Sequence, residues 1–377
     1  MKICFISFNY NAISETFLNR HYNLLRPHFE LFHIVGKIEN EQKEKFHNVF
    51  SYNETSVLER FKLKFKRIFY GVDFYEKDKI IDLVNLIKPN LVVFQFSFLA
   101  VKIYDVIHKI KCPIAVIHHG TDLNMARVDK SYRKKLSFVW EKSVKVIVIS
   151  KFLAKIAQEL GLDKNKLETI YLGVPISPKI NYLRKSNKFK ILSVGRLTSV
   201  KNHGLLIDAF KILKLKYDNI ELDIVGGGDL FQAYYQKITN LNLTDSVNLI
   251  GSVKFDIVKN YMYNCDVFCL VSKKIETKNT CQEEGLPISL LEASSFSKPL
   301  IGTFSGGIPE IIIDNYNGYL INQDKYELAK KIEILIKNKE RKIIMGSNAY
   351  KTVVEKFNEE IQILEFIKVY KNICNVI

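Results

Sequence analysis

The strongest constraint on the fold is a repeated alternation of short apolar runs with segments of helical periodicity. The apolar runs predict strands at residues 3–8, 31–35, 91–96, 114–118, 144–149 and 168–172, and then at 189–194, 222–225, 247–250, 267–271, 299–302 and 318–321. Buried strands that alternate with helices predict parallel sheets covered by helices on both faces. The chain is therefore expected to be an α/β protein.

The alternation is interrupted once along the chain. Residues 175–188 contain two prolines and four basic residues without a sustained apolar period, which is typical of a linker. We predict an N-terminal Rossmann-like domain over residues 1–174 and a C-terminal one over 189–358, since 377 residues suffice for two domains. Apolar residues at helical spacing predict that 359–377 form a helix that packs back toward the N-terminal domain.

The chain is strongly basic, with 56 Lys and Arg against 40 Asp and Glu and a formal net charge of +16. This balance favours an anionic partner, which could be nucleic acid, an acidic membrane surface or a phosphorylated ligand. A hydrophobic content of 47% excludes a mainly disordered protein. We find no recognised nucleic-acid-binding motif, so a basic nucleic-acid-binding protein is only the alternative from another functional class.

The six cysteines show no metal-ligand spacing and are expected to be reduced thiols of a cytoplasmic protein. No run of 18 apolar residues is present, so no membrane-spanning helix is predicted. The opening MKICFISFNYN has a short apolar run without a small-residue cleavage site. It is interpreted as a first strand rather than as a signal peptide.

A pair of cations follows the predicted strand 189–194, in the motif GRLTSVKN. Arg196 and Lys201 lie in the loop between that strand and an amphipathic helix, at the end of the sheet where ligands bind. Arg offers a planar fork to phosphate oxygens and Lys adds a mobile charge, so together they can neutralise a diphosphate. Two solvated surface cations are the alternative.

A pair of carboxylates lies in the second motif, EGLPISLLE. Pro287 suits the first turn of a helix, which places Glu284 in the preceding loop and Glu292 inside the helix. Free backbone N–H groups near Ile288 form an anion site. Glu284 is suited to sugar hydroxyls and Glu292 to a ribose; Glu292 is expected to be partly buried because its neighbours are apolar.

Two glycine-rich stretches complete the motifs of the C-terminal half. SGGIPE at residues 305–310 allows the backbone to turn tightly or approach a ligand. VGGGD at residues 225–229 lacks the spacing of a dinucleotide fingerprint and has no Lys-Ser/Thr, which excludes a P-loop. We interpret it as a turn.

Together, GRLTSVKN, EEGLPISLLEA and SGGIPEIIIDNYNGYLI resemble the retaining glycosyltransferases of family GT4. The resemblance implies the GT-B fold, in which two Rossmann-like domains face each other across a cleft. It also implies that Arg196 and Lys201 bind the donor diphosphate. Glu292 would bind the nucleotide ribose. The family's further donor contacts would come from Glu284 on the transferred sugar, the backbone of Gly285, Leu286 and Ile288, and Val253 beside the base.

In the N-terminal half the resemblance is looser. The segment SETF at residues 14–17 is similar to an element of family members that build bacterial surface polysaccharides, and HHGTD at 118–122 is similar to the family's H-G-x-D element. By that match His119 would reach the donor sugar and Asp122 would hold the loop. Residues 171–175 depart from the family pattern and receive no chemical role.

The resemblance implies a hexosyltransferase that moves a sugar, with retention of configuration, from a nucleotide-diphosphate sugar to a hydroxyl of a glycan or lipid-linked acceptor. A UDP-sugar is the expected donor, and bacterial surface polysaccharide or glycoconjugate assembly is the expected process. No D-x-D motif lies in a suitable loop, so no metal or other cofactor is expected. A GT-B-like sugar-nucleotide epimerase or a phosphorylase is the alternative enzyme.

Most of the remaining positive charge gathers in the N-terminal half. A predicted amphipathic helix carries basic residues beside its apolar face, and these are Arg60, Lys62, Lys64, Lys66 and Arg67. A second cluster contains Lys130, Arg133, Lys134 and Lys135. Such a pattern favours peripheral contact with the anionic inner face of the cell membrane. An ordinary surface helix with solvated charges is the alternative.

Overall fold

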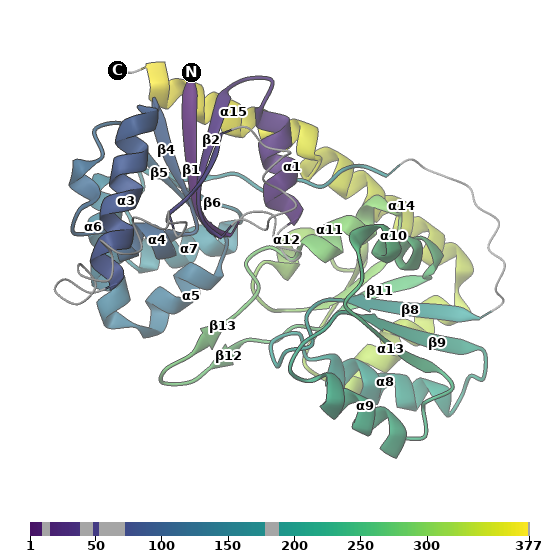
Figure 1. Ribbon diagram of the computed structural model, residues 1–377. Helices are drawn as coiled ribbons and strands as arrows, with labels where there is room; N and C mark the ends of the chain where they lie inside the picture. The colour runs from purple at the N-terminus through teal and green to yellow at the C-terminus, as the bar shows by residue number, and fades with distance from the viewer. Residues whose placement is uncertain (10–15, 38–47, 53–71, 178–187, 376–377) are drawn as a thin grey trace. The chain divides into compact units, whose positions relative to one another are not determined.

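The computed structural model describes the chain except for residues 10–15, 38–47, 53–71, 178–187 and 376–377 (Figure 1). It contains two compact units. The first comprises Met1–Tyr171 together with Ile363–Ile377, and the second comprises Leu172–Gln362. The predicted linker falls largely outside the described residues.

The first unit is built on a parallel sheet of seven strands in the order β3-β2-β1-β4-β5-β6-β7. The strands are β1 (Lys2–Asn9), β2 (Glu30–Lys37), β3 (Val49–Ser51), β4 (Leu91–Gln95), β5 (Ile114–His118), β6 (Lys145–Val148) and β7 (Leu167–Thr169). The helices are α1 (Thr16–Leu25), α3 (Val72–Ile87), α4 (Ser97–Lys102), the 3₁₀ turn η3 (Ile107–Lys109), α5 (Thr121–Val128), α6 (Lys130–Lys142) and α7 (Lys151–Glu159).

The second unit has a parallel sheet in the order β10-β9-β8-β11-β14-β15 and a two-stranded hairpin, β12-β13. Its strands are β8 (Phe189–Val194), β9 (Ile220–Val225), β10 (Val247–Gly251), β11 (Val267–Leu270), β12 (Ile275–Glu276), β13 (Cys281–Gln282), β14 (Leu300–Thr303) and β15 (Gly318–Ile321). Its helices are α8 (His203–Lys214), α9 (Phe231–Asn240), α10 (Phe255–Asn264), α11 (Ile288–Ser295), α12 (Ile308–Ile311), α13 (Lys325–Lys337) and α14 (Lys339–Lys356), and α15 (Glu359–Asn375) follows.

Several helices begin where the sequence supplies a capping side chain. The carboxylate of Asp129 accepts the backbone N–H of Tyr132 at the start of α6, and Asp324 does the same for Glu327 in α13. Asn338 caps α14 through the N–H of Arg341. Each cap satisfies a backbone donor that the first turn of a helix leaves unpaired.

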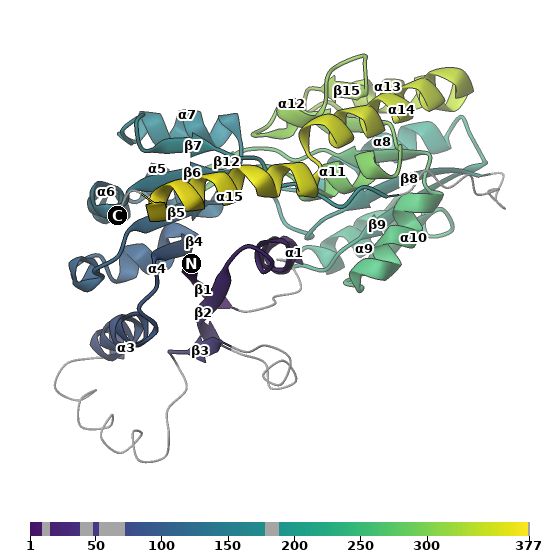
Figure 2. The same cartoon turned by 90° about the horizontal axis from the view of Figure 1, so that it is seen from above.

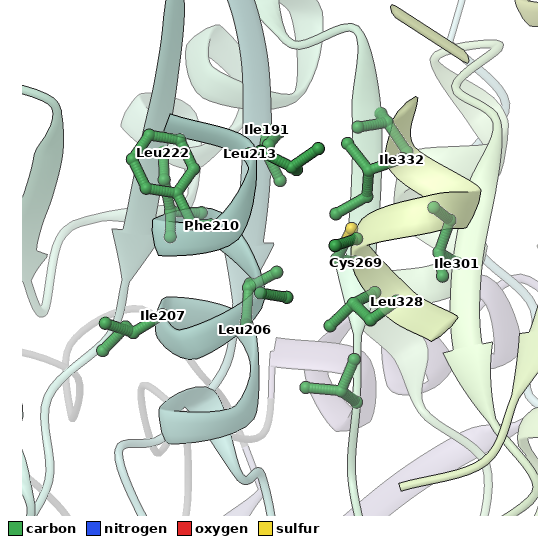
Figure 3. Close-up of a cluster of buried hydrophobic side chains, with 14 of the residues drawn as sticks. Ile191, Leu206, Ile207, Phe210, Leu213, Leu222, Cys269, Ile301, Leu328 and Ile332 are labelled. Atoms are coloured by element: carbon green, nitrogen blue, oxygen red, sulfur yellow. The ribbon is translucent and has the colours of Figure 1, made fainter. Parts of the chain in front are cut away.

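The core of the second unit lies between the sheet and helices α8 and α13 (Figure 3). On α8, Leu206, Phe210 and Leu213 recur at helical spacing and are buried. They pack with Ile191 and Leu222 of the central strands, whose side chains alternate across the sheet. The apolar face of the helix is thereby removed from water, which is the main stabilising contribution to such a unit.

Helix α15 is continuous and begins in the second unit (Figure 2). Its later residues belong to the first unit, where the ring of Phe366 lies 4.5 Å from that of His21 and the ring of Tyr370 lies 6.2 Å from that of Phe5. Tyr370 is fully buried. The core of the first unit is therefore assembled from both ends of the described chain.

The prediction of an α/β protein with two Rossmann-like parallel sheets is confirmed. The predicted strands 114–118, 189–194 and 318–321 coincide with β5, β8 and β15. The prediction for 168–172 is displaced, because pairing with β6 ends at Thr169. The short strands β3, β12 and β13 were not predicted.

Candidate active site

The order of the strands identifies where the second unit would bind a ligand. Strands β8 and β11 are neighbours, and the connections that leave them run toward opposite edges of the sheet. Ligands of open α/β sheets bind outside the carboxyl ends of the strands at this position. Arg196 and Lys201 follow β8, and Ser272 follows β11.

The centre of this site is an ion pair between Lys201 and Glu284. Lys201 Nζ lies 2.6 Å from Glu284 Oε1, and the two side chains are only 15% and 12% exposed. The hydroxyl of Ser272 donates to the same carboxylate oxygen over 2.8 Å. Burial alone would raise the pKa of Glu284, but Lys201, Ser272 and nearby Arg196 hold that pKa below its usual value. Glu284 is therefore a carboxylate at neutral pH.

Arg196 is exposed and forms no ion pair among the described residues. Its loop is held by backbone contacts of the neighbouring Leu197, whose N–H donates to Gly227 O over 2.8 Å. Gly226 has φ 144°, and a Cβ there would lie 2.1 Å from Gly195 O. The glycine-rich segment predicted to be a turn therefore also supports the loop that carries Arg196.

A bridge of side-chain amides ties the loop of Lys201 to the loop of Ser272. Asn202 adopts a left-handed backbone conformation with φ 51°, and its Nδ2 donates to Gln323 Oε1 over 2.7 Å. Gln323 Nε2 donates in turn to Ser272 O over 2.8 Å, and the Thr303 hydroxyl donates to the same carbonyl. The loop of Lys201 is thus restrained by Gln323, which follows β15, as well as by the ion pair with Glu284.

The glycines at residues 306 and 307 position the Glu284 loop. Gly307 N–H donates to Glu284 O over 3.0 Å, and Gly306 N–H donates to Glu283 Oε1 over 3.1 Å. Gly306 has φ 54°, and a Cβ there would lie 2.0 Å from Glu284 O. A side chain at this position would displace the loop, so the SGG motif is explained by a close backbone approach.

Helix α11 begins one residue later than predicted. Pro287 is its N-cap with φ −76° and ψ 102°, and Ile288 is its first residue, so the prediction of Pro287 in the first turn is wrong. The N-cap residue retains extended ψ, which is the conformation that Pro287 adopts. Glu292 is 8% exposed, as its apolar neighbours suggested.

Val253, the residue expected beside the base, is half-buried between β10 and α10.

In the first unit, His118 and Asp122 form a fully buried pair at the carboxyl end of β5. His118 Nδ1 lies 2.6 Å from Asp122 Oδ2, and Trp140 Nε1 donates to His118 Nε2 over 3.0 Å. Asp122 also accepts from the backbone of Ser97, Gly120 and Leu123. His118 and the backbone N–H of Ser97 hold the pKa of Asp122 far below its usual value despite burial.

His119 lies beside this pair and contacts Gln95, with 2.8 Å between His119 Nε2 and Gln95 Oε1. Its ring is 4.4 Å from that of Phe96 and 5.2 Å from that of Phe17. Burial lowers the pKa of His119 to about 4, against an opposing effect of Asp122. The imidazole is therefore neutral at pH 7. Sequence reasoning missed Gln95, His118 and Trp140, although the His-His pair and the single Trp were visible.

The predicted basic surface is only partly described. Residues 60–67 lie outside the described residues. Arg133 donates through Nε and Nη2 to the carbonyls of Ala126 and Arg127, each over 2.8 Å, and Lys135 lies 5.3 Å from the ring centroid of Tyr104. Lys130 and Lys134 are exposed. Arg133 thus closes the end of α5 instead of reaching outward.

The described ranges were compared with two requirements, those of a membrane-spanning helix and of a metal site, and meet neither. No helix in them is long and apolar enough to cross a membrane. No group of three His, Cys, Asp or Glu side chains in the same ranges could hold a metal ion.

Comparison with known proteins finds a family match within the second unit. Residues 179–352 match the family described as glycosyl transferases group 1. The chain is 26% identical over 261 residues to "Amylovoran biosynthesis glycosyltransferase AmsK" of Erwinia amylovora, covering 68% of this chain and 63% of that protein, which is less than two thirds of its length. It is 27% identical to "Uncharacterized glycosyltransferase MJ1178" of Methanocaldococcus jannaschii over 91% of this chain and 90% of that protein.

Among solved structures, the chain resembles Anabaena Alr3699/HepE in complex with UDP and glucose. The TM-score is 0.80 at 19% identity, with coverage of 99% of this chain and 100% of that one. At this identity the likeness shows the fold, and the chain therefore has the GT-B type of architecture with two Rossmann-like domains.

Proposed function

We propose that the chain transfers a sugar from a nucleotide-diphosphate sugar to a hydroxyl of a glycan or lipid-linked acceptor, as the match of residues 179–352 to glycosyl transferases group 1 supports. The observation that carries this proposal is the arrangement of Arg196, Lys201 and Glu284 at the carboxyl edge of the second sheet. Two cations and a carboxylate at this position match a ligand that joins a diphosphate to a sugar.

Arg196 and Lys201 would bind the donor diphosphate and stabilise its growing negative charge as the sugar leaves. Arg196 is exposed and forms no ion pair in the described part of the chain, so its guanidinium is available to phosphate oxygens. Lys201 is held in place by Glu284 before any ligand arrives. Charges fixed in advance stabilise a transition state without reorganisation at the moment of reaction.

Glu284 would accept hydrogen bonds from hydroxyls of the transferred sugar, and its ionised state supports this role. Glu292 would bind the nucleotide ribose, and Val253 would lie beside the base. The backbone of Gly285, Leu286 and Ile288 would add donor contacts at the start of α11. His119 would contact the donor sugar, with Asp122 holding its loop.

UDP is the proposed nucleotide, supported by the HepE complexes with UDP and with UDP-glucose. AmsK is named for amylovoran biosynthesis and WcaL of Escherichia coli for colanic acid biosynthesis, which supports an acceptor in bacterial surface polysaccharide or glycoconjugate assembly. Retention of configuration and independence of metal ions are also proposed, the latter because Arg196 and Lys201 supply positive charge.

We further propose a cytoplasmic protein in peripheral contact with the membrane, supported by the net charge of +16 and by exposed Lys130 and Lys134. Flotation with anionic liposomes tests this contact. Equal recovery with neutral vesicles would argue against it.

A thermal-shift screen of nucleotide sugars tests the proposed reaction, because a ligand that binds the folded state raises its unfolding temperature. UDP-sugars are expected to raise it for the unaltered chain and to raise it less for Lys201→Ala. No shift with any nucleotide sugar would contradict the proposal. Conversion of a bound nucleotide sugar without an acceptor, other than hydrolysis, would favour the epimerase alternative.

A further inference from the structure

The buried contact between Trp140 and His118 determines which nitrogen of His118 carries the proton. An indole N–H can only donate a hydrogen bond, and Trp140 Nε1 lies 3.0 Å from His118 Nε2. His118 Nε2 must therefore present its lone pair. The proton is then on Nδ1, which donates to Asp122 Oδ2 over 2.6 Å. This pattern of hydrogen bonds defines one tautomer of His118.

The opposite tautomer would disrupt this arrangement. Its Nδ1 lone pair would face the Asp122 carboxylate at 2.6 Å, and its Nε2–H would face the indole N–H. Both His118 and Asp122 are 0% exposed, so water could not relieve either repulsion. A buried carboxylate that loses a donor is strongly destabilised.

Asp122 transmits this order to the loop that carries His119. Its Oδ1 accepts from the backbone N–H of Gly120 over 3.2 Å and of Leu123 over 3.1 Å. Gly120 has φ 121°, a conformation that residues other than glycine rarely adopt. His119 is thus flanked by two residues that the Asp122 carboxylate holds, while Gln95 holds its ring.

Helix α6 supports the same carboxylate at a second point. Tyr132 OH lies 2.8 Å from the Ser97 hydroxyl, and Ser97 donates to Asp122 Oδ2 through both its backbone N–H and its hydroxyl. Tyr132 and Trp140 both belong to α6, eight positions apart. One helix therefore supports Asp122 through two separate partners.

We propose that Trp140 is a positioning residue for His119, acting by fixing the tautomer of His118 and with it the Asp122 carboxylate that orders the loop. One part of this proposal rests on the proposed function, namely that His119 contacts the substrate. The tautomer of His118 is independent of that function and can be measured on the ligand-free chain.

Nitrogen NMR of the chain labelled with ¹⁵N-histidine reads the tautomer directly. In the unaltered chain His118 is expected to show a protonated Nδ1 and an unprotonated Nε2, with assignment by loss of the signals in His118→Asn. In Trp140→Phe, Asp122 still accepts the Nδ1 proton but no donor faces Nε2, so the Nε2 signal is expected to shift toward that of a protonated nitrogen. A protonated Nε2 in the unaltered chain, or no change in Trp140→Phe, would overturn the proposal.

Enzyme kinetics distinguish positioning from a merely structural role. His118→Asn retains an N–H near the position of Nδ1 but has no tautomer for Trp140 to select. We expect Trp140→Phe to lower turnover of UDP-glucose about tenfold, but to cause no further loss in a chain that already carries His118→Asn. Multiplicative losses in the double variant would show that Trp140 acts independently of His118, and would overturn the proposal.

Phe138→Leu, a change of an aromatic residue on the same helix, is the matched control and should leave turnover unchanged. If the unaltered chain turns over no nucleotide sugar, the proposed function fails, and the NMR result alone decides whether Trp140 fixes His118. If the chain is active and the NMR signals do not respond to Trp140→Phe, the function stands and the positioning role is wrong.

Discussion

Lys201 Nζ and Glu284 Oε1 lie 2.6 Å apart in a mostly buried ion pair at the carboxyl edge of the second sheet. The family resemblance gave these residues separate roles, one on the diphosphate and one on the transferred sugar. In the ligand-free site, the positive charge of Lys201 is therefore already balanced by the negative charge of Glu284. If a diphosphate binds as proposed, it must compete with Glu284 for the ammonium group of Lys201, while Arg196 is free of any ion pair among the described residues.

Lys201→Ala and Glu284→Gln are expected to have opposite effects on UDP affinity. Lys201→Ala removes a cation from the diphosphate, so turnover should fall more than tenfold and UDP should bind more weakly. Glu284→Gln also lowers turnover, because a sugar contact is lost, but it removes a competing negative charge. UDP should then bind as tightly as before or roughly two- to tenfold more tightly. Calorimetric titration with UDP and initial rates separate the two effects.

Glu340→Gln, an exposed carboxylate at the start of α14, is the control and should alter neither quantity. If Glu284→Gln weakened UDP binding as much as Lys201→Ala does, Glu284 would have to serve the nucleotide and not the sugar.

Gly306→Ala should damage the site through the backbone. The new Cβ would lie 2.0 Å from Glu284 O and would also strain a left-handed residue. We expect destabilisation of about 2–3 kcal/mol and a loss of turnover of more than tenfold.

Gly161→Ala is the matched control, since Gly161 also has positive φ but has no atom within 4 Å of the added Cβ. It should cost about 1 kcal/mol and leave turnover intact; equal costs for the two variants would refute the close contact. Thermal unfolding and initial rates provide the two measurements.

His203 should make the second unit sensitive to acid. Its ring packs at 6.0 Å from that of Tyr234, and neither ring nitrogen has a hydrogen-bond partner within the described residues. Burial, aided by the charge of Lys201, lowers its pKa to about 3. Because the unfolded chain binds this proton near pH 6.5, the stability contribution is present above that pH and is lost as the pH falls toward the folded value.

His203→Phe is therefore expected to retain more stability than the unaltered chain when the pH falls from 7 to 5. The difference should be about 2 kcal/mol, measured as the free energy of unfolding in urea. Leu205→Phe adds a ring on the same helix without removing a titratable group, so its effect should be the same at both pH values. An equal acid response of His203→Phe and the unaltered chain would show that His203 is protonated in the folded state.

The central strands could be predicted because parallel strands buried on both faces are continuous apolar runs. Strand β8 is an example, and its bounds agreed with the sequence. The hairpin β12-β13 could not be predicted, since two-residue strands produce no run. Pro287 was misplaced by one position because proline is compatible with both the N-cap and the first turn.

The motifs of the second unit identified Arg196, Lys201 and Glu284 as candidates, but no local pattern indicates that Lys201 contacts Glu284. That contact depends on two loops that follow different strands. The same holds for Trp140, whose helical position is visible in the sequence but whose indole N–H could have faced any buried acceptor. The sequence alone does not determine which side chains contact each other when the contact depends on tertiary packing.

The two compact units are not two consecutive stretches of chain, because Ile363–Ile377 belong to the first of them. During translation, the ribosome therefore synthesises the whole second unit before Phe366 and Tyr370 can reach Phe5 and His21. The second unit can complete its core first, although it is made later. Until α15 emerges, Phe5 and His21 of the first unit lack these ring contacts, and apolar surface that stays exposed during synthesis favours aggregation.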